Sequence, residues 1–488
     1  MVLELNEIKS IRKSEIDTLA ASPIKRKLKK IGYLLRYGMP FNKFIKYTLS
    51  YLFVLPLAKI KINLGSKAVR EKYFGNTGKD DAGGGNGNTC YIAVNIGNSG
   101  IGDAIVAIRF LRDMANFVNE SNKTKTGING NTGNGKDETF KKADGMEVES
   151  NGNKIVFDIF YRSPGSIEFI ASPLSVVRRV LDLFDYSCLH KFYDIDLRLN
   201  TFFIEEEINE ASRKKLSDKF PALLKIIENI KTNQISLEKY IKTRPFSEGI
   251  LSDVVTAMGL SRASYLNYAA GIAYSFSSSS SGGNNDNDIG KWNKSGIGLN
   301  IAIDSTATTK FNLKDVKFIT IHDGWDENTK ISDEISTKSY LPEMWSELMK
   351  LLKSEIPGYT TVQLGGLGNG SDIEGVDLNL RGKTTLKEAA SILSESSLHI
   401  DTDSGLVHIA TSLGTKCVVL FGPTNAAYCS YPENLNITPR LCGNCWWNTD
   451  SWMNSCPKGL VVPECMSSIE PTVIANRIIS KLKNDADT

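Results

Sequence analysis

The chain has 488 residues, of which 41% are hydrophobic, enough for two or three globular domains. Its formal net charge at pH 7 is only +3, so a nucleic-acid-binding role for the whole protein is not expected.

Positive charge is concentrated in the first 72 residues, which hold sixteen Lys or Arg against five Asp or Glu. The apolar run Tyr47–Leu57 in this segment is shorter than the about 20 residues that span a bilayer, and it lacks the position and parts of a secretory signal peptide. We expect a cytoplasmic protein with a basic N-terminal extension over residues 1–88. We expect the extension to pack on the body of the protein. The alternative is peripheral contact with anionic lipid on the inner face of the plasma membrane.

Three stretches rich in Gly, Asn, Ser and Asp interrupt the chain at Gly75–Asn88, Asn119–Asn153 and Ser275–Ser295. They cannot bury enough apolar surface to order themselves, so we expect surface loops. The expected units after the extension are a first α/β domain over 89–274 with an insertion at about 119–153, a linker over 275–314, a second α/β domain over 315–440, and a Cys-rich lobe with a terminal helix over 441–488.

The first half begins with a buried strand, Cys90–Ile96, and a glycine loop, Gly97–Gly102. Helical spacing of apolar residues predicts a helix over Asp103–Val118. A second strand is expected at Lys154–Phe160, followed by helices at Leu174–Phe184 and Arg213–Ile230. The glycine loop is one residue short of G-x-G-x-x-G, and no acidic ribose partner follows at the expected distance, which disfavours a nicotinamide-dependent oxidoreductase.

The second half alternates strands and helices more regularly, which predicts a parallel sheet covered by helices. The expected strands are Phe318–His322, Thr361–Gly365, Leu398–Asp401 and Cys417–Phe421. The expected helices are Pro342–Leu352, Thr385–Ser394 with Thr384 as N-cap, Gly405–Leu413, and a final helix from Glu470 or Pro471 to about Lys483 that packs across the cleft. Two such halves predict a ligand crevice between them, at the carboxyl ends of the strands.

The segment Asp403-Ser404-Gly405-Leu406-Val407-His408 follows a buried strand and opens a helix. Unpaired backbone N–H groups and the helix dipole at such a start form a site for phosphate. Ser404 can add a hydroxyl, Gly405 permits close approach of a ligand, and His408 lies one turn further on the same face. The alternative is that Ser404 is only an N-cap and His408 a core histidine.

This segment, followed by Phe421-Gly-Pro-Thr424, resembles the donor-binding segment of glycosyltransferase family 9, which includes the heptosyltransferases of lipopolysaccharide synthesis. The resemblance extends upstream to Val362–Gly366, Leu380–Glu388 and Thr337–Trp345. In the first half, Gly100-Ile-Gly-Asp103 resembles the Gly-Asp element of the family. The resemblance implies a GT-B architecture, with two Rossmann-like domains facing across a cleft, and transfer with inversion and without a catalytic metal or cofactor.

By this resemblance Asp103 is the general base for the acceptor hydroxyl, or alternatively only a helix cap. The donor site would comprise Lys338, Gly365, Gly366, Asp403, Ser404, Gly405, Leu406 and His408. Lys338 would face the donor phosphates, or be a solvated lysine. Asp403 would contact the donor sugar or hold the loop. His322, where the first strand of this half ends, would contact the donor or be structural.

Four cysteines near the C-terminus, Cys442, Cys445, Cys456 and Cys465, predict a four-thiolate structural site for zinc or iron. The alternative is free buried cysteines. Cys417 is interpreted as a core residue and Cys429 as an alternative candidate ligand for the metal. Asp401 and Asp403 spell D-x-D, as do Asp194 and Asp196. We do not expect a shared metal, because Asp401 and Asp403 alternate at a strand end and Asp194 and Asp196 belong to a strand.

The expected reaction is sugar transfer, with ADP-heptose favoured as donor, to a glycan, lipid-linked or protein acceptor. The expected partners do not include nucleic acid. The alternatives are a catalytically silent nucleotide-sugar-binding protein and, less favoured, the oxidoreductase. The base and sugar of the donor, and the acceptor, are left open by the sequence.

Overall fold

The computed structural model describes residues Val69, Tyr73, 87–97, 100–126, 153–200, 204–234, 248–272, 298–324, 336–367, 371–446 and 456–486. The basic residues of the N-terminal extension, residues 127–152 and the loop at 275–295 lie outside these ranges. None of the described helices is both long enough and apolar enough to cross a bilayer.

The first domain is built on a five-stranded sheet of order β3-β2-β1-β4-β5, in which only β5 is antiparallel to its neighbour. The central strand is buried because its sequence, TCYIAVNIG, carries apolar side chains on both faces. The strands are β1 (Thr89–Gly97), β2 (Lys154–Tyr161), β3 (Val177–Asp182), β4 (Ile195–Leu199) and β5 (Ile204–Ile208).

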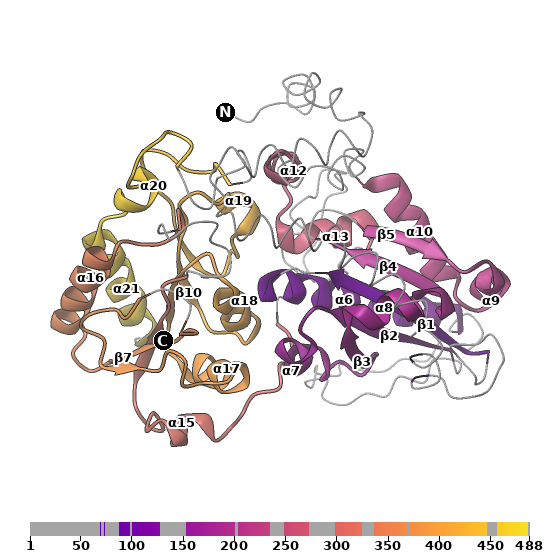
Figure 1. The fold of residues 1–488 in the computed structure, drawn as a ribbon, viewed down its shortest axis with the longest axis horizontal. Coiled ribbons are helices and arrows are strands. Elements are labelled where there is room, and N and C mark those ends of the chain that lie inside the picture. Colours follow the sequence, from indigo (N-terminus) through magenta and orange to yellow (C-terminus); the bar gives the residue numbers. More distant parts are fainter. Residues whose placement is uncertain are drawn as a thin grey trace, which may run out of the picture.

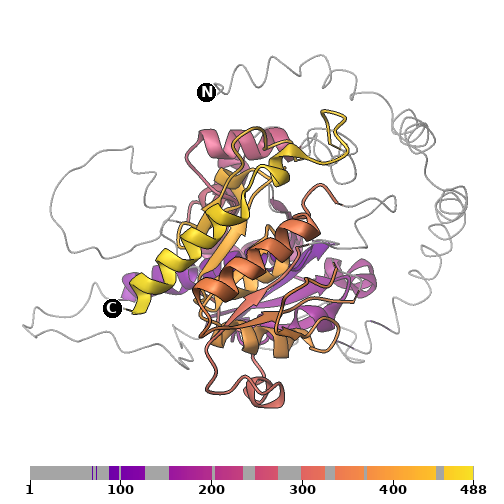
Figure 2. The same cartoon turned by 90° about the vertical axis from the view of Figure 1, so that its left-hand side faces the viewer.

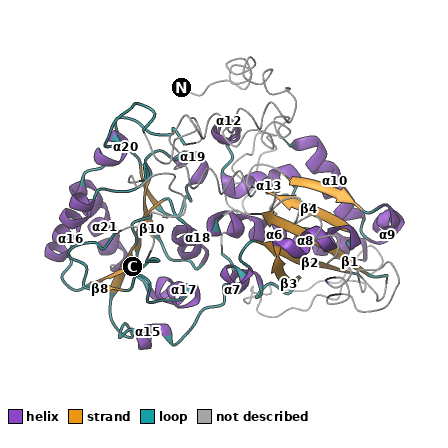
Figure 3. Ribbon diagram, in the orientation of Figure 1, coloured by secondary structure: helices purple, strands orange, loops and turns teal. Residues whose placement is uncertain are grey.

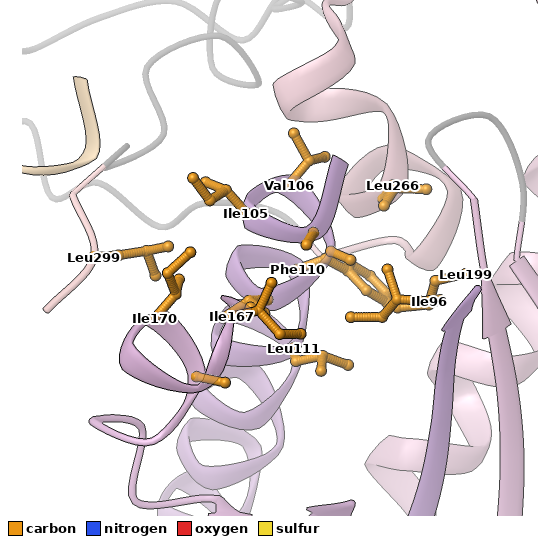
Figure 4. Close-up of a cluster of buried hydrophobic side chains, with 14 of the residues drawn as sticks. Ile96, Ile105, Val106, Phe110, Leu111, Ile167, Ile170, Leu199, Leu266 and Leu299 are labelled. Atoms are coloured by element: carbon orange, nitrogen blue, oxygen red, sulfur yellow. The ribbon is translucent and has the colours of Figure 1, made fainter. Parts of the chain in front are cut away.

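Helices cover both faces of this sheet (Figure 1). They are α6 (Ile101–Thr126), α7 (Glu168–Ala171), α8 (Leu183–Leu189), α9 (Arg213–Lys219), α10 (Pro221–Asn233), α12 (Glu248–Ala257) and α13 (Arg262–Ala270), with 3-10 turns at Pro164–Ser166, His190–Phe192 and Glu210–Ser212. Helix α6 directs Ile105, Val106, Phe110 and Leu111 into a cluster with side chains of β1, β4, α7 and α13 (Figure 4). This packing fixes the start of α6 above the carboxyl end of β1.

The second domain is built on a six-stranded parallel sheet of order β11-β10-β9-β6-β7-β8. The strands are β6 (Phe318–Ile321), β7 (Thr360–Gln363), β8 (Leu378–Asn379), β9 (His399–Thr402), β10 (Cys417–Leu420) and β11 (Leu435–Ile437). Numbered within the domain, this is the order 3-2-1-4-5-6 of a Rossmann fold, and the chain reverses its direction of winding between β6 and β9.

The two faces of the second sheet are covered by different helices. On one face, Ile319, Ile400 and Val418 pack in a cluster with α16 (Pro342–Glu355) and α21 (Pro471–Ala486), which run side by side on the outside of the domain (Figure 2). On the other face lie α17 (Leu386–Glu395) and α18 (Gly405–Ser412), next to the first domain (Figure 3). The remaining helices are α15 (Ala307–Lys310), α19 (Ala426–Cys429) and α20 (Glu464–Ser467).

The two domains meet through α18 against α6 and through α19 against α12 and α13. Their apolar side chains form one continuous cluster, which includes Ile105 of α6 and Val407 of α18. The predicted α/β fold of GT-B type, with two Rossmann-like domains, is confirmed by the two sheets and their order.

Several predicted elements differ from the structure. Residues 174–184 were expected to be helical, but they hold strand β3, since Val177–Asp182 pairs with β2 at the sheet edge. The helix expected over Arg213–Ile230 is two helices, α9 and α10, because Pro221 begins a new helix after Phe220. Helix α6 continues to Thr126, into the segment expected to be an insertion loop.

Two predictions at helix ends are also corrected. The N-cap of α17 is Thr385 and not Thr384, since the Thr385 side chain accepts a hydrogen bond from the backbone N–H of Glu388. The final helix, α21, packs on α16 of its own domain rather than across to the first domain. Its buried residues Ile474 and Ile478 complete the outer face of the second sheet.

Candidate active site

The site lies where the switch points of the two sheets face each other. In the first sheet the winding reverses between β1 and β4, and Gly97 ends β1 just before α6 begins. In the second sheet it reverses between β6 and β9, and Asp403 and Ser404 follow β9 just before α18 begins. Ligands of open α/β sheets bind at such points, so the topology alone brings the predicted base and the predicted donor loop to one place.

The first turns of α6 and α18 are in direct contact. A Cβ atom at Gly102 would lie 2.4 Å from Cδ2 of His408, and one at Gly405 would lie 3.6 Å from Cβ of Ile101. Glycine at 102 therefore makes room for the His408 ring of the opposite domain. Because both helices present their amino ends here, their dipoles add positive potential to the same region.

Asp103 lies in the first turn of α6, where its Oδ2 accepts a hydrogen bond of 3.2 Å from the backbone N–H of Gly100. It also forms an ion pair with Arg262, which begins α13. The Asp103 side chain is 32% exposed whereas that of Arg262 is 9% exposed. Asp103 thus caps the helix and still keeps a solvent-accessible carboxylate, so the two roles considered for it are compatible.

Ser404 is the N-cap of α18, and its Oγ accepts a hydrogen bond of 3.2 Å from the N–H of Leu406. Its hydroxyl donates to Oδ2 of Asp401, a fully buried carboxylate. The hydroxyl hydrogen is therefore engaged inside the protein rather than directed at a ligand. Within the described part of the chain, no hydrogen bond occupies the N–H of Gly405 or Val407, which leaves these amides of the first turn for a ligand.

Lys338 reaches the same loop from the segment before α16. Its Nζ donates to the backbone oxygen of Asp403 at 3.1 Å and to Oδ2 of Asp403 at 3.0 Å, and it lies 5.3 Å from the centre of the Trp446 ring. Burial raises the pKa of Asp403, but the positive charge of Lys338 outweighs burial and holds the pKa below its ordinary value. Lys338 is thus placed beside the start of α18 by a carboxylate of that loop.

His408 is buried, and its Nδ1 lies 2.5 Å from the hydroxyl oxygen of Tyr431. Burial and the positive charge of Arg262 lower the pKa of His408 to about 3. The ring is therefore neutral at physiological pH. Its Nε2 lies against Gly102 of the opposite domain, where a Cβ atom would come within 2.7 Å, so the ring packs between the two domains and does not carry the positive charge of an imidazolium.

The glycines predicted near the nucleotide follow β7. Gly365 has a φ of +137°, and a Cβ atom there would lie 3.0 Å from Cδ2 of His322. Only glycine suits this backbone conformation beside the His322 ring. Gly366 is exposed. The loop lies next to the end of β6, at the same edge of the sheet as Ser404.

Three residues of the site were not predicted from the sequence: Arg262, Tyr431 and Arg109. Arg109 is 1% exposed, its guanidinium carbon lies 5.7 Å from the centre of the Tyr431 ring, and both of its terminal nitrogens have no hydrogen-bond partner among the described residues. A charged residue within the apolar face of α6 is a signal that sequence reasoning could have used. Arg262 and Tyr431 carry no comparable signal.

Asp401 and Asp403 do not converge on one point. Asp401 contacts His322, His399 and Ser404, whereas Asp403 contacts Lys338. Asp401 and Asp403 thus have different partners. Asp194 and Asp196 are likewise paired separately, with Lys215 and with Tyr186.

The four C-terminal cysteines lie close enough together for their charges to affect the pKa of Cys465. Burial raises the pKa of Cys465 to about 12, and the neighbouring thiols of Cys442, Cys445 and Cys456 add to this rise. However, no group of three or more His, Cys, Asp or Glu among the described residues has an arrangement that could hold a metal ion. The zinc or iron site therefore stays a prediction. Cys417 is buried in the core as expected, and Cys429 is buried in α19 at the domain interface.

Residues 332–439 match the family model described as glycosyltransferase family 9 (heptosyltransferase). Residues 332–439 are similar to glycosyltransferase family 9 and are called the family 9 segment. It contains Lys338, the Gly365 loop and the whole of α18 with Ser404 and His408. The family 9 segment thus includes every residue predicted for the donor site.

Among curated proteins, the chain is 39% identical over 51 residues to lipooligosaccharide heptosyltransferase 2 of Haemophilus influenzae (strain ATCC 51907 / DSM 11121 / KW20 / Rd). The match covers 10% of this chain and 15% of that protein.

Solved structures with a similar arrangement include E. coli ADP-heptose LPS heptosyltransferase II, at 12% identity and a TM-score of 0.42, over 81% of this chain and 99% of that one. They also include the iron-containing dodecameric glycosyltransferase TibC from enterotoxigenic E. coli H10407, at 12% identity and a TM-score of 0.45, over 81% of this chain and 76% of that one.

Proposed function

We propose that this protein is a glycosyltransferase that moves a sugar, with heptose favoured, from a nucleoside diphosphate donor to an acceptor hydroxyl. The observation that carries the proposal is the contact between the first turns of α6 and α18, through Gly102 and His408. Through this contact, Asp103 of the first domain lies near the start of α18, which supports a shared site. The family 9 segment and the similarity to a lipooligosaccharide heptosyltransferase support heptose and a glycan acceptor.

In the proposed reaction, Asp103 accepts the proton of the acceptor hydroxyl while the hydroxyl oxygen forms a bond to the anomeric carbon of the donor sugar. The bond from that carbon to the diphosphate oxygen breaks, and the leaving diphosphate takes the electron pair. Asp103 and the start of α18 belong to opposite domains, so base and leaving group can flank the sugar on opposite faces, which leads to inversion. Arg262 stabilises Asp103 in the ionised form that a base requires.

The negative charge that develops on the leaving diphosphate is stabilised by fixed groups of the second domain. The amides of Gly405 and Val407 and the dipole of α18 face the charge, and Lys338 adds a full positive charge. His408 packs against Gly102 and keeps the first turn of α18 beside that of α6. ADP-heptose is the favoured donor, and the acceptor is a glycan, a lipopolysaccharide core, another lipid-linked sugar or a protein.

The test is Asp103→Asn, assayed for sugar transfer and for binding of the donor nucleotide. Transfer should fall by about 10²- to 10⁴-fold, the usual contribution of a general base, while donor binding stays within about twofold of wild type. Asp182→Asn is the matched control, because Asp182 also caps a helix but lies at the edge of the first sheet. A fully active Asp103→Asn enzyme would refute the assignment of the base, and donor binding without any transfer by the wild type would favour a silent binding protein.

The donor itself is identified by a thermal-shift panel of ADP-, GDP- and UDP-sugars. A ligand that binds only the folded state stabilises it by RT ln(1 + [L]/Kd), so the true donor gives the largest rise in melting temperature. A flat response to all of them contradicts a nucleotide-sugar site.

We also propose that Cys442, Cys445, Cys456 and Cys465 hold a structural zinc or iron ion. Thiolates are ligands that both metals accept, and the proximity of the four side chains supports a shared site. The metal content of the purified protein should be about one ion per chain and should be lost in Cys445→Ser, but not in Cys188→Ser, a buried cysteine of the first domain. A metal-free wild type would contradict this role.

We also propose that the protein is cytoplasmic and that its basic N-terminal extension contacts anionic membrane lipid. Vesicle co-sedimentation of the full chain should decline with salt if the extension binds lipid by charge. Binding that is insensitive to salt would contradict the electrostatic mode.

A further inference from the structure

We propose that His322 is a further donor-binding residue, whose imidazole is oriented by Asp401 and donates a hydrogen bond from Nε2 to the diphosphate of the donor. The inference rests on the proposed function, because it takes the diphosphate to bind at the start of α18. His322 directly follows β6, and its backbone N–H bonds to the oxygen of Ile400 in β9 at 3.0 Å. It therefore lies at the switch point of the second sheet, where ligands bind in this fold.

The orientation of the His322 ring is fixed by a buried carboxylate. Its Nδ1 lies 3.1 Å from each carboxylate oxygen of Asp401, which is fully buried, 3.1 Å from the backbone nitrogen of Gly324, and 3.4 Å from Oγ of Ser404. A carboxylate on one ring nitrogen sets both the direction of the ring and the identity of the nitrogen that remains for a ligand. The free nitrogen is Nε2, since no hydrogen bond to it occurs within the described part of the chain.

Nε2 faces the glycine loop after β7. A Cβ atom at Gly365 would lie 3.3 Å from this nitrogen. The ring thus lies between that loop and the N-cap Ser404. His322 is 6% exposed, and its Nε2 lies beside the loop predicted to be near the nucleotide.

The charges around His322 favour its protonated form. Burial lowers its pKa, but Asp401, with a contribution from Asp323, outweighs burial and the opposing charge of Arg381, so that the pKa lies above its ordinary value. A protonated ring carries a hydrogen on Nε2, as donation to a phosphate oxygen requires.

His399 provides a matched control within the same network. Its Nε2 lies 3.2 Å from Oδ2 of Asp401 and its Nδ1 lies 3.0 Å from Oγ1 of Thr320, so both ring nitrogens contact protein groups. It is fully buried. His399 therefore shares the carboxylate of His322 but has no nitrogen left for a ligand.

The first experiment is calorimetric titration of His322→Gln and His399→Gln with ADP, or with GDP or UDP if one of these binds the wild type better. At pH 6.5, His322→Gln should weaken binding by about tenfold or more, the usual effect of losing one charge-assisted hydrogen bond. His399→Gln, when folded, should stay within about twofold of wild type. Equal affinities for folded His322→Gln and wild type would overturn the inference.

A second measurement observes the histidines of the wild type directly. The chain has four histidines, so the Cε1 signals of histidine-labelled wild type can be resolved and titrated with and without the nucleotide. Bound diphosphate should raise the titration midpoint of one signal, because it favours the protonated ring, and His190→Gln and His408→Gln should leave that signal in place. Four midpoints that the nucleotide leaves unchanged would overturn the inference.

The outcomes also separate this inference from the proposed function. If no nucleoside diphosphate binds the wild type, both fail together. If one binds, Lys338→Met weakens its binding, and His322→Gln and the histidine signals are unaffected, only the role of His322 fails.

Discussion

The substitution Gly102→Ala tests whether the contact between the two helix starts sets the distance between base and donor. A methyl group at this position would lie 2.4 Å from Cδ2 and 2.7 Å from Nε2 of His408. Ordinary contacts between carbon atoms are about 3.5 Å or longer, so the shortfall is about 1 Å. The His408 ring cannot easily give way, because it is buried and its Nδ1 lies 2.5 Å from the Tyr431 hydroxyl.

We therefore expect the Gly102→Ala enzyme to accommodate the methyl group by separating the two domains by about 1 Å. A displacement of this size between reacting groups can cost on the order of 100-fold in rate, and we expect kcat/KM for sugar transfer to fall by about that factor. The donor loop is unchanged, so binding of the nucleoside diphosphate should stay within about threefold of wild type. The assay is release of the nucleoside diphosphate, with calorimetry for binding.

Gly100→Ala is the matched control, because among the described residues a Cβ atom there meets nothing closer than Oδ2 of Asp103 at 3.9 Å. It should keep kcat/KM close to wild type. If Gly102→Ala is as active as Gly100→Ala, the contact does not set the geometry of the reaction, and the reasoning is wrong.

Three further predictions concern the second domain. Lys338→Met should weaken nucleoside diphosphate binding about tenfold or more and lower the melting temperature, because Asp403 stays buried without its counter-ion; unchanged calorimetric binding contradicts a role in the donor site. Thr385→Ala should cost about 1 kcal/mol in urea unfolding while Thr384→Ala is nearly neutral, and equal losses would reverse the assignment of the cap. The pKa of His408 in the folded state is about 3, so its contribution to stability is present above the ordinary value of 6.5 and is lost as pH falls toward 3, by about 2 kcal/mol at pH 5. His408→Gln should therefore lose less stability than the wild type between pH 8 and pH 5. Melting temperatures that fall in parallel with pH for the two proteins would contradict a buried neutral ring.

The elements that the sequence predicted well are those whose signals are local. The start of α18 at Gly405 follows from a buried strand, a polar N-cap and a glycine in sequence, and these same residues form the turn that we propose to bind phosphate. Strand β3 was mistaken for a helix because Val177–Asp182 is short, carries two arginines and lies at a sheet edge. Its state is decided by pairing with β2, which no local pattern reveals.

The parts of the site that the sequence did not reveal depend on contacts between distant residues. Arg262 meets Asp103, and Tyr431 meets His408, only because α13 and the segment after α19 fold against the two helix starts. The partnership of His322 with Asp401 likewise requires β6 and β9 to be neighbours, which the strand order provides. Spacing along the chain carries no information about such pairs.

The central claim is that the donor diphosphate binds the amides in the first turn of α18. A crystal structure with the nucleoside diphosphate identified in the thermal-shift panel tests it directly. We predict phosphate oxygens at about 3 Å from the N–H nitrogens of Gly405 or Val407, with Lys338 and Asp103 on either side. A diphosphate bound elsewhere, with that turn covered by side chains of the protein, would contradict the account.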